Sequence, residues 1–324
     1  MSRLKYVGEP LPEITDATAF GNVVVLAGGR SSEREISLKT GNAVHAALFR
    51  RGVAATLVDP AQVSLAEIAD SHYDRAFIAL HGPGGEDGTM QGALEWLGIP
   101  YTGSGVLGSA LCMDKLRTKQ IALAAGVPTP DWVRLDSSES VDDALAKLGL
   151  PLIVKPASQG SSVGMSRVED AGDLVAAWRA ASALDPVVIA ERCVVGPEYT
   201  VGILHEQALP AIRIETPRAF YDYQAKYFSG GTTRYHLPCG LDRAAEGELQ
   251  RLAMLAFRAA GAAGWGRVDF MIGADDRPML LEVNTVPGMT DTSLVPMAAK
   301  ACGMDFEQLV WRVLETSFMR EPAR

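Results

Sequence analysis

The N-terminal third of the chain alternates strand-like and helix-like segments, and this alternation most constrains the fold. Residues 23–27 read Val-Val-Val-Leu-Ala and stop at Gly28-Gly29, which is typical of a buried strand followed by a turn. Apolar residues then recur at helical spacing, and residues 54–58 and 75–80 are two further strand-like runs. Strands that alternate with helices predict a parallel sheet covered by helices.

Beyond this region the strands continue, but the connections between them become less regular. Strand-like runs cover residues 152–155, 187–191, 199–204, 211–215, 266–271 and 278–283, and a helix is expected over 249–260. We therefore expect a mixed fold, α/β and α+β. Its predicted domains are an N-terminal α/β domain over 1–104, a central lobe over 105–195 and a C-terminal lobe over 196–324.

Charge and hydropathy exclude several classes of protein. The 30 basic and 39 acidic residues give a net charge of −9, which disfavours broad binding to nucleic acid. The apolar runs are strand-sized, whereas a membrane-spanning helix needs about 20 apolar residues, so we expect no membrane partner. The N-terminal segment mixes acidic residues with prolines and lacks a long apolar stretch, so we expect a cytoplasmic protein.

Two glycine motifs match known signatures without their usual context. Residues 103–108 fit the dinucleotide-binding spacing G-x-G-x-x-G, but no clean strand precedes them and no acidic residue follows at the required distance. Residues 160–164 fit G-x-S-x-G, the turn that presents a nucleophilic serine. Because residues 165–168 continue as a strand, we interpret this segment as a hairpin whose tip suits phosphate.

Two segments near the C-terminus carry polar residues at strand spacing. Arg267 and Asp269 are two positions apart, as are Glu282 and Asn284, so each pair shares one face of its strand. Two carboxylates and an amide on neighbouring strands form a hard-oxygen site suited to magnesium. A surface salt-bridge ladder is the alternative, but the apolar neighbours favour burial, and buried charges require a partner.

Lysines are available to complement these carboxylates. Lys155 ends a strand-like run directly before the serine hairpin, and Lys226 lies in the aromatic-rich run 220–227. A single lysine is usually solvated. Together with a phosphate-binding hairpin and a carboxylate metal site, the two lysines indicate a nucleoside triphosphate pocket without a P-loop.

In the order and spacing of its motifs, the chain resembles the bacterial D-alanine:D-alanine ligases of the ATP-grasp superfamily. The matching segments, over nearly the whole chain, are residues 28–37, 81–88, 113–115, 155–164, 221–227, 266–269 and 282–294. The resemblance implies a three-lobed ATP-grasp fold with an N-terminal open parallel α/β domain. It also implies a homodimeric enzyme of peptidoglycan synthesis, with D-alanine and ATP as substrates.

The resemblance further implies a two-step reaction. The carboxylate of one D-alanine attacks the γ-phosphate of ATP, which gives an acyl phosphate and ADP. The amine of a second D-alanine then displaces phosphate and forms the dipeptide. Two Mg²⁺ (or Mn²⁺) ions would be bound by Asp269, Glu282 and Asn284.

The same resemblance assigns residues to the two amino acids. Glu33 would bind the ammonium of the first D-alanine, with His81 nearby. Ser293 and Leu294 would orient the second D-alanine. The oxyanion of the tetrahedral intermediate would be bound by Arg267 and the backbone N–H of Gly288.

It also assigns residues to ATP and to a lid. The phosphates would be bound by Lys115, Lys155 and Lys226, and the adenine and ribose pocket would be lined by Glu191, Val194 and Glu198. Ser161 and Tyr227 would join the hairpin to the segment 221–227 and so close a lid over the acyl phosphate.

One departure and two alternatives follow. The family often has a glutamate before the hairpin, where this chain has Gln159, so we expect a retained lid with altered pH behaviour. The first alternative is a ligase that makes D-alanyl-D-lactate, or another ATP-grasp carboxylate-amine ligase. The second is an ATP-binding regulator without catalysis, which the intact Arg267, Asp269, Glu282 and Asn284 disfavour.

Overall fold

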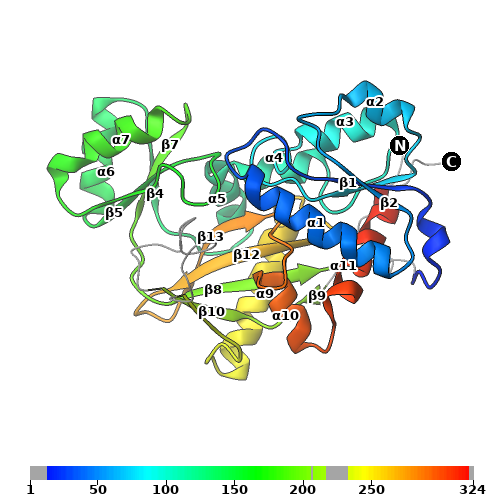
Figure 1. The fold of residues 1–324 in the computed structure, drawn as a ribbon. Coiled ribbons are helices and arrows are strands. Elements are labelled where there is room, and N and C mark those ends of the chain that lie inside the picture. The colour runs from blue at the N-terminus through cyan, green and yellow to red at the C-terminus, as the bar shows by residue number, and fades with distance from the viewer. Residues whose placement is uncertain (1–12, 206, 217–232, 321–324) are drawn as a thin grey trace.

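The first of three sheets is parallel, as the alternation predicted. The computed structural model describes residues 13–205, 207–216 and 233–320 (Figure 1). The sheet has the strand order β2-β1-β3, with both neighbours parallel to β1. Its strands are β1 (Val23–Leu26), β2 (Ala55–Val58) and β3 (Arg75–Ile78), and its helices are α1 (Arg34–Arg50), α2 (Leu65–Asp70) and α3 (Thr89–Leu97).

The second sheet is antiparallel and has the order β4-β7-β5-β6. Helix α6 packs against β4, and α7 packs against β5. β5 and β6 form the hairpin predicted around residues 160–164, and no helix follows directly, so a nucleophile elbow is excluded. The bounds are β4 (Trp132–Leu135), α6 (Ser138–Leu148), β5 (Leu152–Pro156), β6 (Ser166–Val168), α7 (Leu174–Ser182) and β7 (Val188–Arg192).

The third sheet has the order β11-β10-β8-β12-β13, with β9 paired to β8, and all its pairs are antiparallel. The predicted helix over 249–260 begins earlier, because Asp242 caps it by accepting from two backbone N–H groups. The bounds are β8 (Glu198–Leu204), β9 (Gln207–Ala208), β10 (Ile212–Glu215), β11 (Arg234–His236), α9 (Arg243–Ala259), β12 (Trp265–Ile272) and β13 (Pro278–Asn284).

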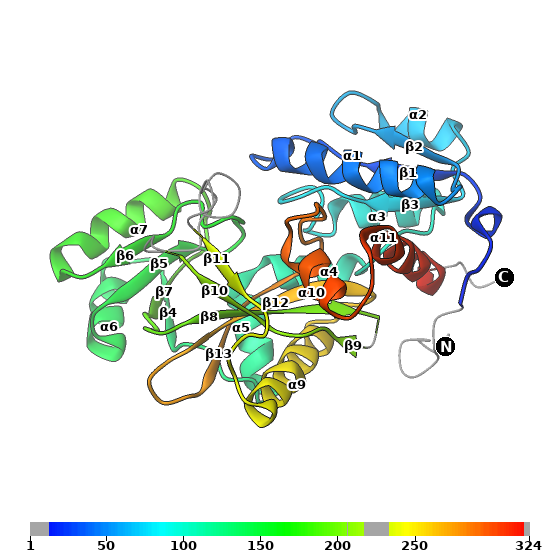
Figure 2. The same ribbon diagram turned by 60° about the horizontal axis from the view of Figure 1, so that its bottom comes forward.

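Each sheet falls within one of the three predicted domains, but some helices pack across those divisions. α4 (Val106–Met113) and α5 (Lys115–Ala124) belong to the predicted central lobe, yet both pack against β13 of the third sheet. Figures 1 and 2 both show the second sheet beside the third, with α5 close to their junction. The sequence positions 104 and 195 remain predicted boundaries.

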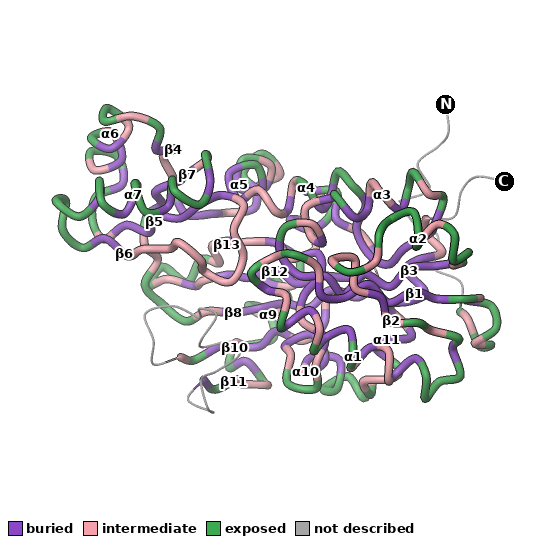
Figure 3. Tube along the Cα trace, turned by 45° about the horizontal axis from the view of Figure 1, so that its top comes forward, coloured by how far each residue is buried: buried purple, intermediate pink, exposed green. Residues whose placement is uncertain are grey.

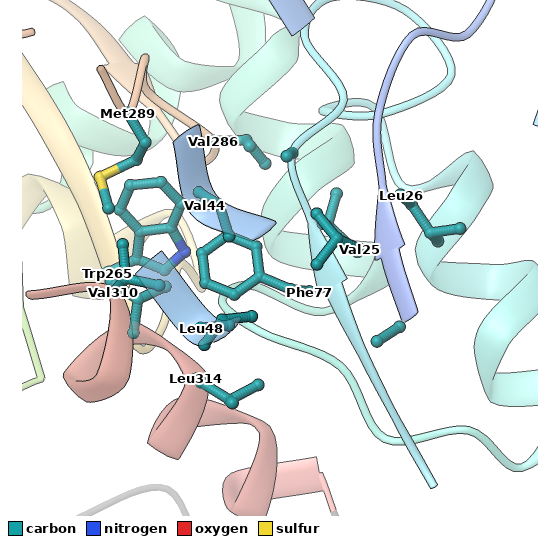
Figure 4. Close-up of a cluster of buried hydrophobic side chains, with 14 of the residues drawn as sticks. Val25, Leu26, Val44, Leu48, Phe77, Trp265, Val286, Met289, Val310 and Leu314 are labelled. Carbon is teal, nitrogen blue, oxygen red and sulfur yellow. The ribbon is translucent and has the colours of Figure 1, made fainter. Parts of the chain in front are cut away.

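The C-terminal helices return to the first sheet. α11 (Phe306–Glu315) packs against α1, and α10 (Leu294–Ala301) packs against both α11 and β8. The core also joins the first sheet to the third. Phe77 of β3 lies near Trp265 of β12, with ring centroids 6.5 Å apart (Figure 4). Figure 3 shows the central strands of this region as buried. No helix in the described ranges is long and apolar enough to span a membrane.

Candidate active site

A cavity of about 410 Å³ lies between the second and third sheets. The second sheet contributes Lys155 and Glu191 to its wall, and the third contributes Asp269 and Glu282. A volume of this size is typical of small-molecule sites. The chain therefore brings residues more than a hundred positions apart to one pocket at the junction of two lobes.

Asp269 and Glu282 lie directly opposite one another in the register between β12 and β13. Asp269 is only 4% exposed, and its carboxylate accepts hydrogen bonds from Thr200 Oγ1 at 2.6 Å and Asn284 Nδ2 at 3.1 Å. The alternative of a surface salt-bridge ladder is wrong, because Asp269 and its neighbour Arg267 are both buried. Thr200, on the adjacent strand β8, was not anticipated from the sequence.

The donor set at this position fits a hard divalent cation. Carboxylate oxygens from Asp269 and Glu282 and the amide of Asn284 are the ligand types that Mg²⁺ and Mn²⁺ favour, and substrate phosphates commonly complete the shell. A metal cluster of three or more acidic, histidine or cysteine side chains is absent from the described residues. Two protein carboxylates are nevertheless enough where a triphosphate supplies further oxygens.

Two of the three predicted phosphate-binding lysines lie at the cavity. Lys115, at the start of α5, donates to the backbone oxygen of Gln159 at 2.7 Å, and its Nζ lies 3.4 Å from Glu282 Oε2. Lys155 donates to Glu191 Oε1 at 2.5 Å. Lys226 and Tyr227 lie outside the described residues.

A further lysine stands behind Glu191. Lys119 Nζ lies 2.7 Å from Glu191 Oε2, and the whole Lys119 residue is buried. Burial opposes ionisation of Glu191, but the two ammonium groups hold its pKa below its ordinary value. Sequence reasoning missed Lys119, although it lies four residues after Lys115 and hence on the same face of α5.

Val194 and Glu198 also line the cavity, on either side of the turn between β7 and β8. The strand β10 adds Arg213, which the sequence did not single out. Apolar surface comes from Met271 and Leu281, next to the acidic positions on β12 and β13. The pocket therefore combines a charged end with an apolar wall, as a nucleotide requires.

A second, smaller cavity of about 20 Å³ adjoins this one. Lys115, Glu282 and Asn284 line it, together with Gly160 at the hairpin tip and Glu86 of the first domain. The sequence did not select Glu86, although it lies in the glycine-rich loop that follows His81. Residues of all three predicted domains therefore line this cavity.

The hairpin tip approaches Glu33 closely. A Cβ atom added to Gly160 would lie 2.4 Å from Glu33 Oε1, so a larger residue there requires the glutamate to move. Glu33 is the N-cap residue of α1 and therefore lies at a helix start. Ser161 and Ser162, the next two residues, have φ values of 53° and 59°, so the tip is a left-handed turn.

His81 joins the first domain to the loop after β13. Its Nδ1 lies 2.9 Å from the backbone oxygen of Val286 and 3.5 Å from Glu86, and its Nε2 lies 2.8 Å from Thr40 Oγ1. Burial lowers the pKa of His81, but the hydrogen bond and charge of Glu86, with the charge of Glu33, raise it above its ordinary value. His81 thus orients the loop rather than presenting an open ring nitrogen.

That loop carries the remaining predicted residues. Gly288 lies between β13 and α10, and Leu294 is a buried residue at the start of α10. Ser293 is the N-cap of α10, and its Oγ accepts from the backbone N–H of Thr290 at 3.0 Å. The hydroxyl is therefore fixed at a helix N-terminus, where an anion is stabilised.

Comparisons with known proteins agree with this geometry. Residues 121–315 match the family described as D-ala D-ala ligase C-terminus, and residues 60–104 match the D-ala D-ala ligase N-terminus. The D-alanine–D-alanine ligase of Alkalilimnicola ehrlichii is 58% identical over 308 residues, which cover 95% of this chain and 98% of that protein. The D-alanine–D-alanine ligase of Methylococcus capsulatus is 55% identical over 305 residues, which cover 94% of this chain and 98% of that protein.

Solved structures are similar over the same length. The structure of D-alanine–D-alanine ligase from Bacillus anthracis complexed with ATP has a TM-score of 0.81 and 35% identity, and covers 93% of this chain and 98% of that one. A D-Ala:D-Ser ligase from Enterococcus faecalis has a TM-score of 0.80 and 28% identity, and covers 91% and 99%.

Proposed function

The chain belongs to the D-alanine–D-alanine ligase family, and from this membership we propose how its residues divide the work of the reaction. It is an ATP-dependent ligase of the ATP-grasp fold that joins two D-alanine molecules, and the dipeptide is used in peptidoglycan synthesis. The observation that carries the assignment of roles is the pairing of Asp269 with Glu282 inside the cavity between the second and third sheets.

ATP occupies the larger cavity. Lys115 and Lys155 bind its phosphates, together with Lys226, because a buried triphosphate requires several cations close to it. Its adenine and ribose lie along Glu191, Val194 and Glu198, against the apolar wall. This placement directs the γ-phosphate toward Glu282, which lines both cavities.

Asp269, Glu282 and Asn284 would hold two Mg²⁺ or Mn²⁺ ions next to the triphosphate. When bound, these ions neutralise the charge of the phosphate oxygens during transfer. The protein holds the ligands in place before any ion arrives. Thr200 and Asn284 donate to Asp269, and Lys115 approaches Glu282 to 3.4 Å.

The amino acids bind between the first domain and the loop after β13, which meet at His81 and Val286. Glu33 binds the ammonium of the first D-alanine, with His81 fixing the neighbouring loop, so that the carboxylate of this D-alanine points to the γ-phosphate. Ser293 and Leu294 orient the second D-alanine, whose amine attacks the acyl phosphate. Because the site holds the amine next to the acyl phosphate, the two need not meet by chance in solution, and the entropic cost of that encounter is lowered.

The intermediate is stabilised and protected by separate groups. Arg267 and the backbone N–H of Gly288 bind the oxyanion of the tetrahedral intermediate. Ser161 at the hairpin tip and Tyr227 close the lid that excludes water from the acyl phosphate. Water must be excluded because hydrolysis of the acyl phosphate would waste the ATP.

The enzyme works in the cytoplasm as a homodimer. ATP is supplied there, and the interface between copies would cover apolar residues that are exposed in the single chain. Trp96 of α3 is 91% exposed and Leu107 of α4 is 69% exposed, and these two helices pack against each other. Sedimentation of the wild type and of Trp96→Ser tests this interface: a wild-type monomer would contradict it.

The function is tested with purified protein, ATP, Mg²⁺ and D-alanine. We expect one phosphate released for each D-alanyl-D-alanine formed. Replacing the second amino acid with D-serine or D-lactate tests the related activities, and L-alanine is the stereochemical control. No dipeptide and no phosphate from folded protein would exclude the ligase reaction.

A further inference from the structure

The buried cluster behind the nucleotide cavity contains one lysine for which phosphate binding gives no role. Lys119 is fully buried, and its Nζ lies 2.7 Å from Glu191 Oε2, 2.6 Å from Thr129 Oγ1 and 3.3 Å from the backbone oxygen of Pro130. Thr129 and Pro130 accept hydrogen bonds from its ammonium, and Glu191 is its ion-pair partner. Lys119 therefore does not line the cavity but contacts Glu191, which does.

Glu191 lies between two lysines, one on each oxygen. Lys155 binds Oε1 from the cavity side, at 2.5 Å, and Lys119 binds Oε2 from the buried side. Lys155 lines the cavity, so a triphosphate placed there attracts its ammonium. If Lys155 moved toward the phosphates, Glu191 would lose one of its two cationic partners.

We propose that Lys119 is a positioning residue for ATP, because it keeps Glu191 neutralised and so allows Lys155 to leave Glu191 for the phosphates. A buried carboxylate that loses its last cation is strongly destabilised. With Lys119 in place, Glu191 keeps a full charge partner when Lys155 departs. Without Lys119, Glu191 would hold Lys155 and compete with the phosphates for it.

The position of Lys119 is itself fixed by the third sheet. Thr129, which accepts from Lys119, donates its own hydroxyl proton to the backbone oxygen of Leu280 at 2.9 Å. Leu280 is two residues before Glu282 on β13. The cation behind Glu191 is therefore anchored to the strand that carries the proposed metal ligands.

The test rests on the proposed ATP-dependent ligation and measures KM for ATP in the variant Lys119→Met. Because Lys155 stays on Glu191, we expect KM for ATP to rise by about tenfold or more, with kcat and KM for D-alanine nearly unchanged. Lys147→Met, which changes an exposed lysine of α6, is the matched control and should behave as wild type. An unchanged KM for ATP in a folded Lys119→Met would overturn the proposal.

The double variant Lys119→Met with Glu191→Gln separates positioning from simple packing. A neutral glutamine no longer requires a cation. Because Glu191 itself lines the ATP cavity, the reference is Glu191→Gln alone, and Lys119→Met should raise KM for ATP less in that background than in the wild type. A packing role predicts the same rise in both backgrounds, and equal rises would contradict our account. If the wild type makes no dipeptide, the ligase assignment fails; if it does and KM for ATP ignores Lys119, only this inference fails.

The pH dependence of KM for ATP tests the same proposal on the wild-type protein, so it does not depend on whether a variant folds. Burial lowers the pKa of Lys119 to about 8, with Glu191 of β7, Lys155 of β5 and nearby Asp131 as the charged groups acting on it. Above that pH Lys119 is neutral, so KM for ATP should rise as pH passes about 8. A KM that stays flat through this range would count against the proposal.

Discussion

Arg267 donates two parallel hydrogen bonds to Asp269, from Nε to Oδ1 at 2.8 Å and from Nη2 to Oδ2 at 2.7 Å. Both residues are buried, at 8% and 4% exposure. A two-pronged arginine pair of this kind fixes the orientation of both groups. The guanidinium proposed to meet the oxyanion and the carboxylate proposed to meet the metal are therefore positioned by each other.

Arg267→Met should lower both stability and activity, because it leaves Asp269 as a buried carboxylate without its guanidinium. We expect a loss of about 3 kcal/mol in the free energy of unfolding, and a fall in kcat of about a hundredfold. Urea unfolding and steady-state kinetics measure the two effects. Arg251→Met, which removes an exposed pair with Glu248, should cost below about 1 kcal/mol. Equal losses in both variants would contradict the role of burial.

Glu282→Gln should abolish most turnover while the protein stays folded. The Glu282 side chain is partly exposed, so water can solvate its carboxylate and the change to an amide should cost little stability. Loss of a metal ligand should lower kcat by about a hundredfold or more. Asp276→Asn, in the turn of the same hairpin, is the matched change of an exposed acid to an amide and should retain the wild-type rate. A Glu282→Gln enzyme with normal kcat would refute the metal role.

Removal of divalent cations should stop the reaction reversibly. Treatment with EDTA should abolish phosphate release, and added Mg²⁺ or Mn²⁺ should restore it, because the donor set consists of hard oxygens. Circular dichroism should be unchanged by EDTA, since Arg267 and Thr200 already hold Asp269 without an ion. Full activity in EDTA would exclude the assigned ions.

His81 predicts a definite pH dependence of stability. Its folded pKa is raised above the value near 6.5 of the unfolded chain, so protonation stabilises the fold. The extra stability of wild type over His81→Gln should be largest below pH 6.5 and should shrink as pH rises through the folded pKa. Urea unfolding at a series of pH values measures it. A difference that grows toward alkaline pH would be the opposite of this expectation.

Sequence reasoning located the residues whose partners are close along the chain. The pairs Arg267 with Asp269 and Glu282 with Asn284 follow from the two-residue period of a strand, and the hairpin between β5 and β6 follows from its glycines. Such relationships depend on local geometry alone. They were correct because no tertiary contact is needed to define them.

The relationships that escaped prediction join distant segments. Lys119 meets Glu191 only because α5 lies beside the second sheet, and Thr200 meets Asp269 only because β8 pairs with β12. Similarly, the C-terminal helix α11 completes the core of the first domain against α1. Nothing in the local spacing specifies such packing. Lys226 and Tyr227 remain assigned from sequence alone.

The central claim is that one carboxylate oxygen of the first D-alanine attacks the γ-phosphate and then leaves in the released phosphate. D-alanine labelled with oxygen-18 in its carboxylate tests this directly. Attack by that oxygen forms the P–O bond, and the second amine then breaks the C–O bond of the acyl phosphate. We therefore predict one labelled oxygen in each phosphate released during dipeptide formation, detected by mass spectrometry. Dipeptide accompanied by unlabelled phosphate would contradict the account.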